Sequence, residues 1–462
     1  MKSATQATTI LAEIDPAKLP ELRDRLTLIG QRTDDNPLFR PRELPDTHFM
    51  RFVLVEDAPG ELRPLLAWET NHDGAPADYL ARVARTTPAI DNVLDCCLAY
   101  PGTAAGPDWI AWMTARAYRS AAFYAAYRGI PRRRVLDDAQ LHAALQTIAD
   151  DPATRAALRE ERHATASARH AYLAARVAAA APTLDTEPRA DAAVRWTTRR
   201  AIVQLGIPAA VGLLVLLGAL VGLAGLVPVL VGVAAVLLAG GAAIGLAIAH
   251  LQHLERTDVP IDTSAPVHDT HALHLEEDYY AQNQLTHLVY LKPGWFRLVV
   301  CYLVLTVIDI AARFYFVLGD LNGITSIHFA RWVIVRDRRD IAAIPPGQAR
   351  RHRLLFFSNY DGSWESYLGE FVDRSSSGLT AIWSNTVLFP RTTNLTGAGA
   401  GDGARNEEAF KQWTRDHQIA TQVWWTGIPR STVQNVRDDV ALRQQLRVTL
   451  TETEAQVWLH KV

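Results

Sequence analysis

The longest uncharged stretch of the chain limits its architecture more than any other feature. Residues Ala201 to Ala249 include no Asp, Glu, Lys or Arg and consist mainly of Leu, Val, Ala and Gly. As one straight helix this stretch would extend to roughly 73 Å, whereas the hydrocarbon core of a bilayer is only ~30 Å thick. The stretch therefore predicts two membrane-crossing helices, with a break near Gly222 to Pro228 where glycine and proline weaken a helix.

The residues before this stretch indicate how a helical hairpin would be oriented. Arg195, Arg199 and Arg200 precede the first span, and Lys and Arg are enriched on the cytoplasmic side of membranes. Because a hairpin returns the chain to the side that it left, we expect both flanking parts to face the cytoplasm from the cytoplasmic (inner) membrane. Glycines along both spans would let the helices pack closely, and no ionisable group suggests a transport path. A buried hairpin in a large soluble core is the alternative.

Charge and cysteine content exclude other classes of protein. The 462 residues carry a formal net charge of -2, which argues against a nucleic-acid partner because such proteins present a basic surface. The three cysteines, Cys96, Cys97 and Cys301, cannot form a disulfide framework, so the soluble parts are expected in a reducing compartment. Residues 1–15 lack the continuous apolar run of a signal peptide, so no signal peptide is expected there.

An internal repeat predicts the fold on either side of the hairpin. "THFMRFVLV" from Thr47 matches "IHFARWVIV" from Ile327, and "TNHDGAPADYL" from Thr70 matches "SNYDGSWESYL" from Ser358. Each copy has the order strand, helix, strand, strand, helix, strand, with fourth strands expected to end at Pro101 and Pro390. This order is that of the ferredoxin-like split βαβ unit. The predicted fold class is α+β, with two tandem ferredoxin-like repeats separated by a helical linker and a transmembrane hairpin.

The chain accordingly divides into five regions. Residues 1–148 form the first repeat with a helical extension, 149–200 a helical linker, 201–250 the hairpin, 251–284 a juxtamembrane linker, and 285–462 the second repeat. Within the second repeat, residues 296–319 form a strongly apolar helix in which Asp309 and Arg313 lie four apart and could pair. This helix could pack on the bilayer surface or the hairpin, form a third span, or belong to the core.

The duplicated turns carry a resemblance to a known superfamily. The tandem arrangement is similar to the dimeric α/β barrel superfamily, whose members include the dye-decolourising peroxidases and chlorite dismutases, both haem enzymes. The peroxidases have a Gly-x-x-Asp-Gly motif whose Asp assists peroxide cleavage. Ser358-Asn359-Tyr360-Asp361-Gly362 occupies that place in the second copy, with the first glycine replaced. The resemblance implies Asp361 and Asn359 as catalytic residues and haem as the cofactor, whereas a purely structural Asp-Gly turn is the alternative.

Histidines and arginines on the second strands extend this hypothesis. His48 and His328 occupy equivalent positions, three residues before Arg51 and Arg331. A neutral histidine can ligate haem iron, and an arginine among apolar strand residues needs a carboxylate, a propionate or another partner. We therefore name His328 and His417 as candidate haem-binding residues and Arg331 as a candidate catalytic residue. The alternative is that each histidine is a satisfied sheet residue and that each arginine pairs within its own half, with Glu69 or Asp361 as the partner.

Three further sequence features carry less weight. The second copy is richer in polar and aromatic groups (Trp383, Ser384, Asn385, His417, Trp424, Trp425), which favours it for any pocket. The histidines between His250 and His274 have helical spacing, but nearby Glu276, Glu277 and Asp278 indicate a solvated linker, and no metal site is predicted. The glycine-rich run from Gly397 to Gly403 lacks a Walker lysine and is typical of a flexible loop.

Two functional hypotheses follow. The first is a membrane-anchored peroxidase- or oxygenase-like oxidoreductase that acts on a hydrophobic or lipid-derived substrate, with haem as the cofactor that the resemblance implies. The second is a non-catalytic, membrane-anchored lipid-binding or scaffold protein. The expected partners are the lipid bilayer and a hydrophobic small molecule. Whether the chain is an enzyme, its substrate and its oligomeric state are left open by the sequence.

Overall fold

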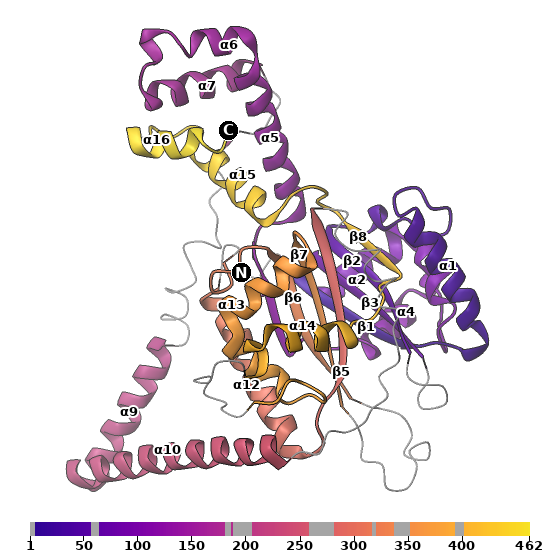
Figure 1. Cartoon of the computed structure of the whole chain (residues 1–462), viewed down its shortest axis with the longest axis vertical. Helices are drawn as coiled ribbons and strands as arrows, with labels where there is room; N and C mark the ends of the chain where they lie inside the picture. Colours follow the sequence, from indigo (N-terminus) through magenta and orange to yellow (C-terminus); the bar gives the residue numbers. More distant parts are fainter. Residues whose placement is uncertain are drawn as a thin grey trace.

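Two antiparallel sheets form the centre of the protein (Figure 1). The computed structural model describes residues 5–56, 64–180, 186–187, 206–257, 281–316, 320–336, 352–392 and 402–462. The first four-stranded sheet has the order β1-β3-β2-β8 and the second the order β4-β6-β7-β5. The strands are β1 (Thr5–Glu13), β2 (Thr47–Val55), β3 (Leu65–Asp73), β4 (Ala122–Ala125), β5 (Gln282–Tyr290), β6 (Ile327–Val335), β7 (Arg353–Asp361) and β8 (Val423–Thr426). The chain is therefore an α+β protein.

Strands β2 and β6 are buried along their whole length, because each sheet has helices on one face and the other sheet on the other. Their side chains alternate as the sequence predicts. Trp332 and Ile334 join the core under the helices, whereas Val333 and Val335 join a core between the two sheets. The alternation therefore directs one set of side chains into the core between the two sheets and the other set into the core between a sheet and its helices.

Helices cover the outer faces of the sheets. The first sheet is covered by α1 (Leu19–Gln31), α2 (Pro76–Thr86), α3 (Asp91–Leu94) and α4 (Pro107–Ala115), and the second by α12 (Trp295–Phe314), α13 (Trp364–Trp383) and α14 (Glu407–Asp416). Short 3₁₀ turns occupy Pro16–Lys18, Pro41–Glu43, Pro88–Ile90, Thr103–Ala105, Glu161–His163 and Gly403–Arg405. The first three begin with proline, whose fixed φ suits the first position of a helical turn.

The fourth strands differ from the sequence prediction. The prediction that strands end at Pro101 and Pro390 is wrong. Helices α3 and α13 end within those two segments, and Cys97 and Thr386 make only isolated bridges. The true last strands, β4 and β8, have four residues each. A strand of this length contains too little alternation to be recognised, whereas each predicted segment combines apolar residues of a helix end with those of the turn that follows.

The last strands are also exchanged between the halves of the chain, which lie before and after the apolar stretch. Strand β4 of the first half pairs with β6, and β8 of the second half pairs with β2. Just before the exchange each segment touches its own sheet, where Ala117 bridges Ile10 and Gln418 bridges His287. Each half therefore needs the other half to complete its sheet.

The helical extensions of both halves and the first helices of the predicted linker (149–200) form a separate unit at one end of the sheets, at the top of Figure 1. It consists of α5 (Arg132–Asp150), α6 (Pro152–Ala157), α7 (Ala166–Ala180), α15 (Val433–Gln445) and α16 (Glu452–Leu459). Leu141, Leu145, Leu173, Leu442 and Trp458 make its core. Helices far apart in the sequence thus bury one another's apolar faces.

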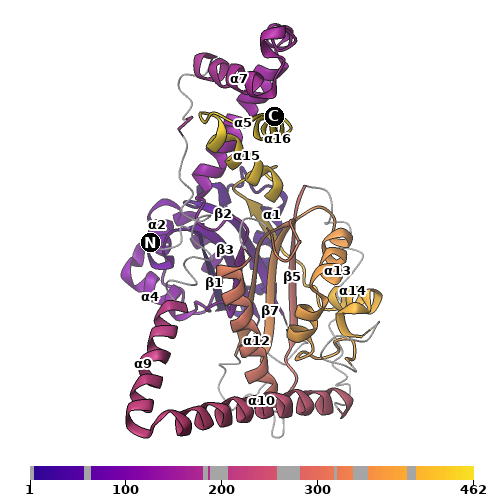
Figure 2. The same cartoon turned by 90° about the vertical axis from the view of Figure 1, so that its left-hand side faces the viewer.

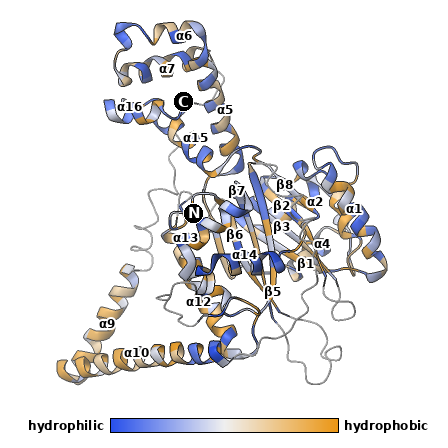
Figure 3. Cartoon of the chain, viewed as in Figure 1, coloured by the Kyte–Doolittle hydropathy of each residue, from blue (hydrophilic) through white to orange (hydrophobic). Residues whose placement is uncertain are grey.

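Two apolar helices leave the globular part at its opposite end (Figure 2). Helices α9 (Ile207–Ala224) and α10 (Leu226–Thr257) are separated by Gly225, whose φ of 85° breaks the helix within the predicted interval. Their large apolar side chains are exposed, and only the last turns of α10 are strongly polar (Figure 3). Including α12, three helices in the described part of the chain are long and apolar enough to cross a membrane.

The arrangement of α9 and α10 differs from the close packing expected from their glycines. The helices point in different directions from Gly225 (Figures 1 and 2). Apart from the chain neighbours and the nearby backbone of the same helix, no heavy atom lies within 4 Å of a Cβ placed on Gly212, Gly218, Gly222, Gly232, Gly240, Gly241 or Gly245. Helices without polar cross-contacts have little to fix their mutual angle, because lipid covers apolar surface as well as a partner helix does.

Helix α12 is buried on one side only. Cys301, Leu305 and Ala312 face the core. Trp295, Val299, Leu303, Val307, Ile310 and Tyr315 are exposed and recur along the helix. Asp309 pairs with Arg313 at 2.7 Å, as the spacing predicts, and also accepts the Phe123 amide of β4 at 3.1 Å. The helix therefore presents an apolar face away from the sheet that it covers.

A buried ion cluster fixes the end of α10 to the second sheet. Glu255 is 3% exposed, and its carboxylate lies 2.6 Å from Lys292 Nζ and 2.8 Å from the Arg297 guanidinium. Lys292 follows strand β5, and Arg297 is in the first turn of α12. His250 of α10 also packs against Phe296. The last turns of α10 are thus held where β5 ends.

Candidate functional site

Two arginines predicted to need partners meet in the space between the sheets. Arg51 and Arg331 both pair with Glu69, Arg51 at 2.9 Å. Arg51 also donates to the Asn359 side chain at 2.6 Å, and Arg331 to the Asn71 side chain at 2.8 Å. Each arginine therefore reaches from one sheet to the other, and the candidate residues Arg331 and Asn359 belong to one network.

This network holds two guanidinium groups but a single carboxylate. Glu69 pairs with Arg51 in the first sheet, whereas Phe357 takes its place opposite Arg331 in the second. Burial lowers the pKa of Arg331 to about 10 and lowers that of Arg51 too. Carbonyl oxygens of Thr8, Thr70, Leu285 and Ser358 accept further N–H groups of the two arginines. The terminal nitrogens of both guanidinium groups are therefore hydrogen-bonded within the protein, and the network joins the two sheets.

The duplicated His and Asp residues form two equivalent pairs. His48 Nε2 lies 3.0 Å from Asp73 Oδ1, and His328 Nε2 lies 2.7 Å from Asp361 Oδ1. The other carboxylate oxygen of each Asp accepts the backbone N–H of the first residue of α5 or α15 at 2.7 Å. A carboxylate at a helix start satisfies a free N–H and favours the helix dipole. The Asp of each Asp-Gly turn therefore joins the end of its strand to the start of α5 or α15 by a hydrogen bond.

The candidate haem-binding residues do not fit a haem group in this arrangement. The second ring nitrogen of His328, Nδ1, lies 2.9 Å from the Tyr127 hydroxyl, so both nitrogens are used by protein groups. His417 donates from Nδ1 to the Trp413 carbonyl at 2.8 Å. The cavity lined by Trp413 and by His287, whose ring lies 5.8 Å from that of His417, measures only about 20 Å³, which is room for one water molecule rather than a porphyrin.

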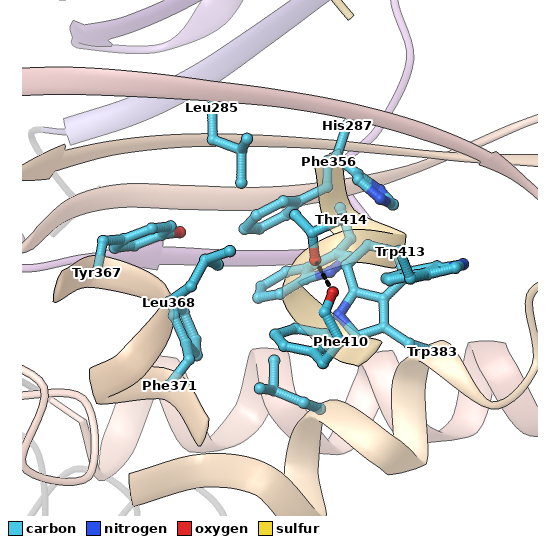
Figure 4. A pocket seen from close by; sticks show the side chains of 12 residues that line it. Leu285, His287, Phe356, Tyr367, Leu368, Phe371, Trp383, Phe410, Trp413 and Thr414 are labelled. Carbon is cyan, nitrogen blue, oxygen red and sulfur yellow. Dashed lines mark hydrogen bonds between the residues drawn. The ribbon is translucent and has the colours of Figure 1, made fainter. Parts of the chain in front are cut away.

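That small cavity lies in the second half, between the sheet and helices α13 and α14 (Figure 4). Its walls are aromatic and include Trp332, Phe356, Tyr367, Phe371, Trp383 and Trp413. The sequence favoured the second half for a pocket, and Trp383 is one of the residues on which that prediction depended. The cavity is an apolar compartment under the helices that cover β5, β6 and β7.

A histidine without a hydrogen bond borders this aromatic cavity. His287 of β5 is 1% exposed, and neither ring nitrogen has a partner among the residues that the structure describes. Its ring lies 4.7 Å from Trp413 and 5.0 Å from Trp383, measured between centroids. Burial lowers the pKa of His287 well below its ordinary value, so the imidazole is neutral. It offers one donor and one acceptor in apolar surroundings.

His287 was missed in the sequence because nothing distinguishes it from a core residue of a strand. In "QLTHLVYL" it shares one face of the strand with Leu285 and Val289, and a single histidine at such a place is usually hydrogen-bonded. The strongest available signal is its neighbour His417, whose ring lies 5.8 Å away. Only the fold brings these two histidines together.

A larger cavity of about 480 Å³ opens at the end of the sheets where β5, β6 and β1 finish. Both halves contribute to its wall: Leu11, Glu13, Leu65, Leu98, Ala115, Arg116 and Tyr118 from the first, and Val335, Arg336 and Arg353 from the second. Its volume lies in the range of small-molecule sites, ≈ 300–1,000 Å³. Nothing in the sequence indicated it, because its residues come together only through the packing of the two sheets.

The remaining sequence candidates add no site. Among the described residues no group of His, Cys, Asp and Glu could hold a metal ion. His268, His271, His274 and residues 397–401 of the glycine-rich run lie outside the described residues. The two buried cysteines Cys96 and Cys97 have pKa values raised by burial to about 11 and about 12, which makes them poor nucleophiles.

Two antiparallel sheets and three helices able to cross a membrane define the class of the protein as α+β and suited to membrane association. Comparisons with known protein families, with curated proteins and with solved structures found no match.

Proposed function

We propose that the chain is a membrane-anchored, non-catalytic lipid-binding protein. In this proposal α9 and α10 are a transmembrane hairpin in the cytoplasmic membrane. Three arginines before the hairpin, Arg195, Arg199 and Arg200, support a cytoplasmic location for both halves. The exposed apolar surface of α9 and α10 supports the anchor, because soluble proteins rarely expose contiguous apolar patches of this size to water.

The observation that carries the proposal is the position of the 480 Å³ cavity relative to the anchor. Strand β5 ends at Tyr290, which pairs with Arg353 in the cavity wall. Two residues further on, Lys292 bonds Glu255 at 2.6 Å in the last turns of α10. The point at which α10 leaves its apolar run and the mouth of the cavity therefore occupy the same end of the second sheet.

Helix α12 fits the same proposal as a helix lying on the bilayer surface. It starts beside the last turns of α10 and runs in a different direction (Figure 2). If α10 crosses the bilayer, the apolar face of α12 from Trp295 to Tyr315 would lie where headgroups and acyl chains meet. Trp and Tyr at its two ends suit that interface.

We further propose that the two halves are diverged copies of one ferredoxin-like unit that have exchanged their last strands, as in a dimeric α/β barrel. The equivalent His-Asp pairs and the equivalent placement of Arg51 and Arg331 support a common origin of the halves. The core between the two sheets supports the barrel-like association.

The test is to express the full chain, separate membranes by flotation, and analyse lipids that remain bound after detergent purification. We expect the chain to float with membranes, to resist alkaline extraction and to retain a lipid in a fixed ratio. Quantitative recovery in the aqueous fraction would contradict the anchor. A purified protein free of lipid would contradict lipid binding.

The peroxidase- or oxygenase-like function remains a prediction that rests on the superfamily resemblance. The same preparation tests it by visible absorbance after expression with ample haem. A strong Soret band that disappears in His328→Ala or His417→Ala would overturn the non-catalytic proposal. A spectrum without that band in folded protein agrees with the small volume beside His417.

A further inference from the structure

The 480 Å³ cavity combines an apolar wall with a cationic one. Leu11, Leu65 and Val335 provide apolar surface, and Leu11 and Val335 continue into the core between the sheets. Three arginines and one glutamate provide the charged groups, so positive charge exceeds negative by two. A site with both features suits a ligand that has an anionic group and an apolar part.

Two of these arginines are held in position by aromatic residues. The Arg336 guanidinium donates to the Tyr302 hydroxyl of α12 at 3.1 and 3.3 Å. The Arg116 guanidinium stacks on Trp112 at 4.0 Å from the ring centroid and donates to the Trp112 carbonyl at 3.2 Å. Among the described residues neither arginine forms an ion pair. Arg116 also contacts the Leu98 carbonyl at 3.5 Å, and Glu13 of the same wall attracts its charge. Each guanidinium still has N–H groups beyond these contacts that an anion can accept.

The location of the cavity indicates where its ligand would come from. Val335, Arg353 and Tyr290 form the last row of the second sheet. Just beyond this row lie the ion cluster of Glu255 and the helix that carries Tyr302. In a membrane-anchored chain this end of the sheets faces the headgroup region, which is rich in phosphate.

We propose that this cavity binds the phosphate group of an anionic amphiphile, with Arg116 and Arg336 as the phosphate-binding residues. The apolar part of the ligand packs on Leu11, Leu65 and Val335. The inference rests on the proposed function, because a membrane-anchored chain meets such ligands as bilayer phospholipids. A soluble phosphate ester has the same anionic group, and the experiment separates the two sources.

The experiment measures binding to the full chain in neutral detergent by calorimetry. The probes are short-chain phosphatidic acid, phosphatidylcholine with the same acyl chains, and glycerol 3-phosphate. We expect phosphatidic acid to bind more tightly than phosphatidylcholine. The double variant Arg116→Gln/Arg336→Gln should weaken its binding by at least about tenfold, since two charge-assisted contacts are lost.

The control is Arg133→Gln, which removes one positive charge, as the single variant Arg336→Gln does, from an exposed position near the start of α5, at the opposite end of the sheets. It should bind phosphatidic acid like the unaltered chain. The single variant Arg336→Gln, at an exposed position, replaces the double variant if the latter does not fold.

Unchanged binding of phosphatidic acid by the folded arginine variants would overturn the proposal. Glycerol 3-phosphate that binds as tightly as phosphatidic acid, with the same loss in the variants, would overturn the bilayer source and support a soluble phosphate ester. Because binding is measured in detergent, its failure is distinct from failure of the anchor. A chain that binds phosphatidic acid but does not float would contradict the anchor alone.

Discussion

His287 and His417 are neighbours in the second half but differ in their hydrogen bonds. His417 has a partner for Nδ1 in the Trp413 carbonyl, whereas His287 has none at either nitrogen among the described residues. A buried polar group without a partner loses its contacts with water and gains nothing in return. His287 should therefore weaken the fold unless a water molecule or a ligand occupies the small cavity beside it.

We predict that His287→Leu stabilises the protein by about 1–3 kcal/mol, the cost of a buried polar group without a partner. The measurement is thermal unfolding of the full chain in detergent, followed by tryptophan fluorescence. The control is His417→Leu, which loses the bond to the Trp413 carbonyl and should unfold at a lower temperature. Equal destabilisation by both substitutions would show that His287 has a partner in solution.

The partner of each candidate residue could be predicted only where the pairing is local. The sequence named Glu69 as a partner for Arg51, and they face each other on neighbouring strands. It did not indicate that Arg331 pairs with the same carboxylate, because that contact joins residues of different sheets. His287 was missed for the same reason, since its isolation depends on which side chains surround it.

At the scale of elements, helices α5 and α15 contact each other through two related pairs. His142 and Arg443 occupy the same position counted from the first residue of their helices, as do Asp138 and Asp439. Arg443 pairs with Asp138, and His142 Nδ1 lies 2.6 Å from Asp439. The bond to Asp439 raises the pKa of His142 above its ordinary value. The first contact is an ion pair between two buried side chains, and the charge of the second depends on the protonation of His142.

We predict that the contact between α5 and α15 weakens as pH rises. A raised folded-state pKa means that protonated His142 stabilises the fold fully below the pKa of an unfolded histidine, about 6.5. This contribution is lost as pH rises through the higher folded-state pKa. The midpoint temperature of unfolding should decrease as the pH is raised from about 6 to about 8, the range in which a histidine titrates.

The variant His142→Gln should lose most of this decrease, because glutamine does not titrate. The control is His460→Gln, an exposed histidine at the end of α16, which should keep the decrease. Identical pH profiles for the unaltered chain and His142→Gln would contradict the prediction.

How far the elements could be predicted depended on their length. Thr47–Val55 and Ile327–Val335 alternate over nine residues, so period and repeat identified them. The break at Gly225 was predicted because glycine and proline interrupt an otherwise uniform apolar run. The four-residue strands β4 and β8 were not, and their exchange depends on long-range pairing that no local pattern encodes.

At the scale of the whole molecule, two features make the halves dependent on each other. Each sheet takes its last strand from the other half, and Glu69 holds one arginine from each sheet. Asn71 also donates to Glu69 at 2.7 Å. The carboxylate is the only negative group that the described residues place between Arg51 and Arg331, so it offsets the repulsion between two buried cations.

We therefore predict that Glu69→Gln destabilises the protein by about 3–5 kcal/mol, because it leaves two buried guanidinium groups without a carboxylate. Denaturant unfolding of the full chain in detergent, followed by tryptophan fluorescence, measures this loss. Tryptophans of both halves should report one transition at a lower midpoint, since neither sheet is complete without the other half.

The control for this change is Asp35→Asn, which removes a carboxylate from the exposed pair with Arg32 and should leave the midpoint nearly unchanged. A Glu69→Gln variant that unfolds in two separate steps would show that the exchanged strands do not couple the halves. A variant with the midpoint of the unaltered chain would show that carbonyl oxygens alone hold both arginines. Loss of stability in a single transition would instead show that the two halves unfold together and that the contact between the sheets couples them.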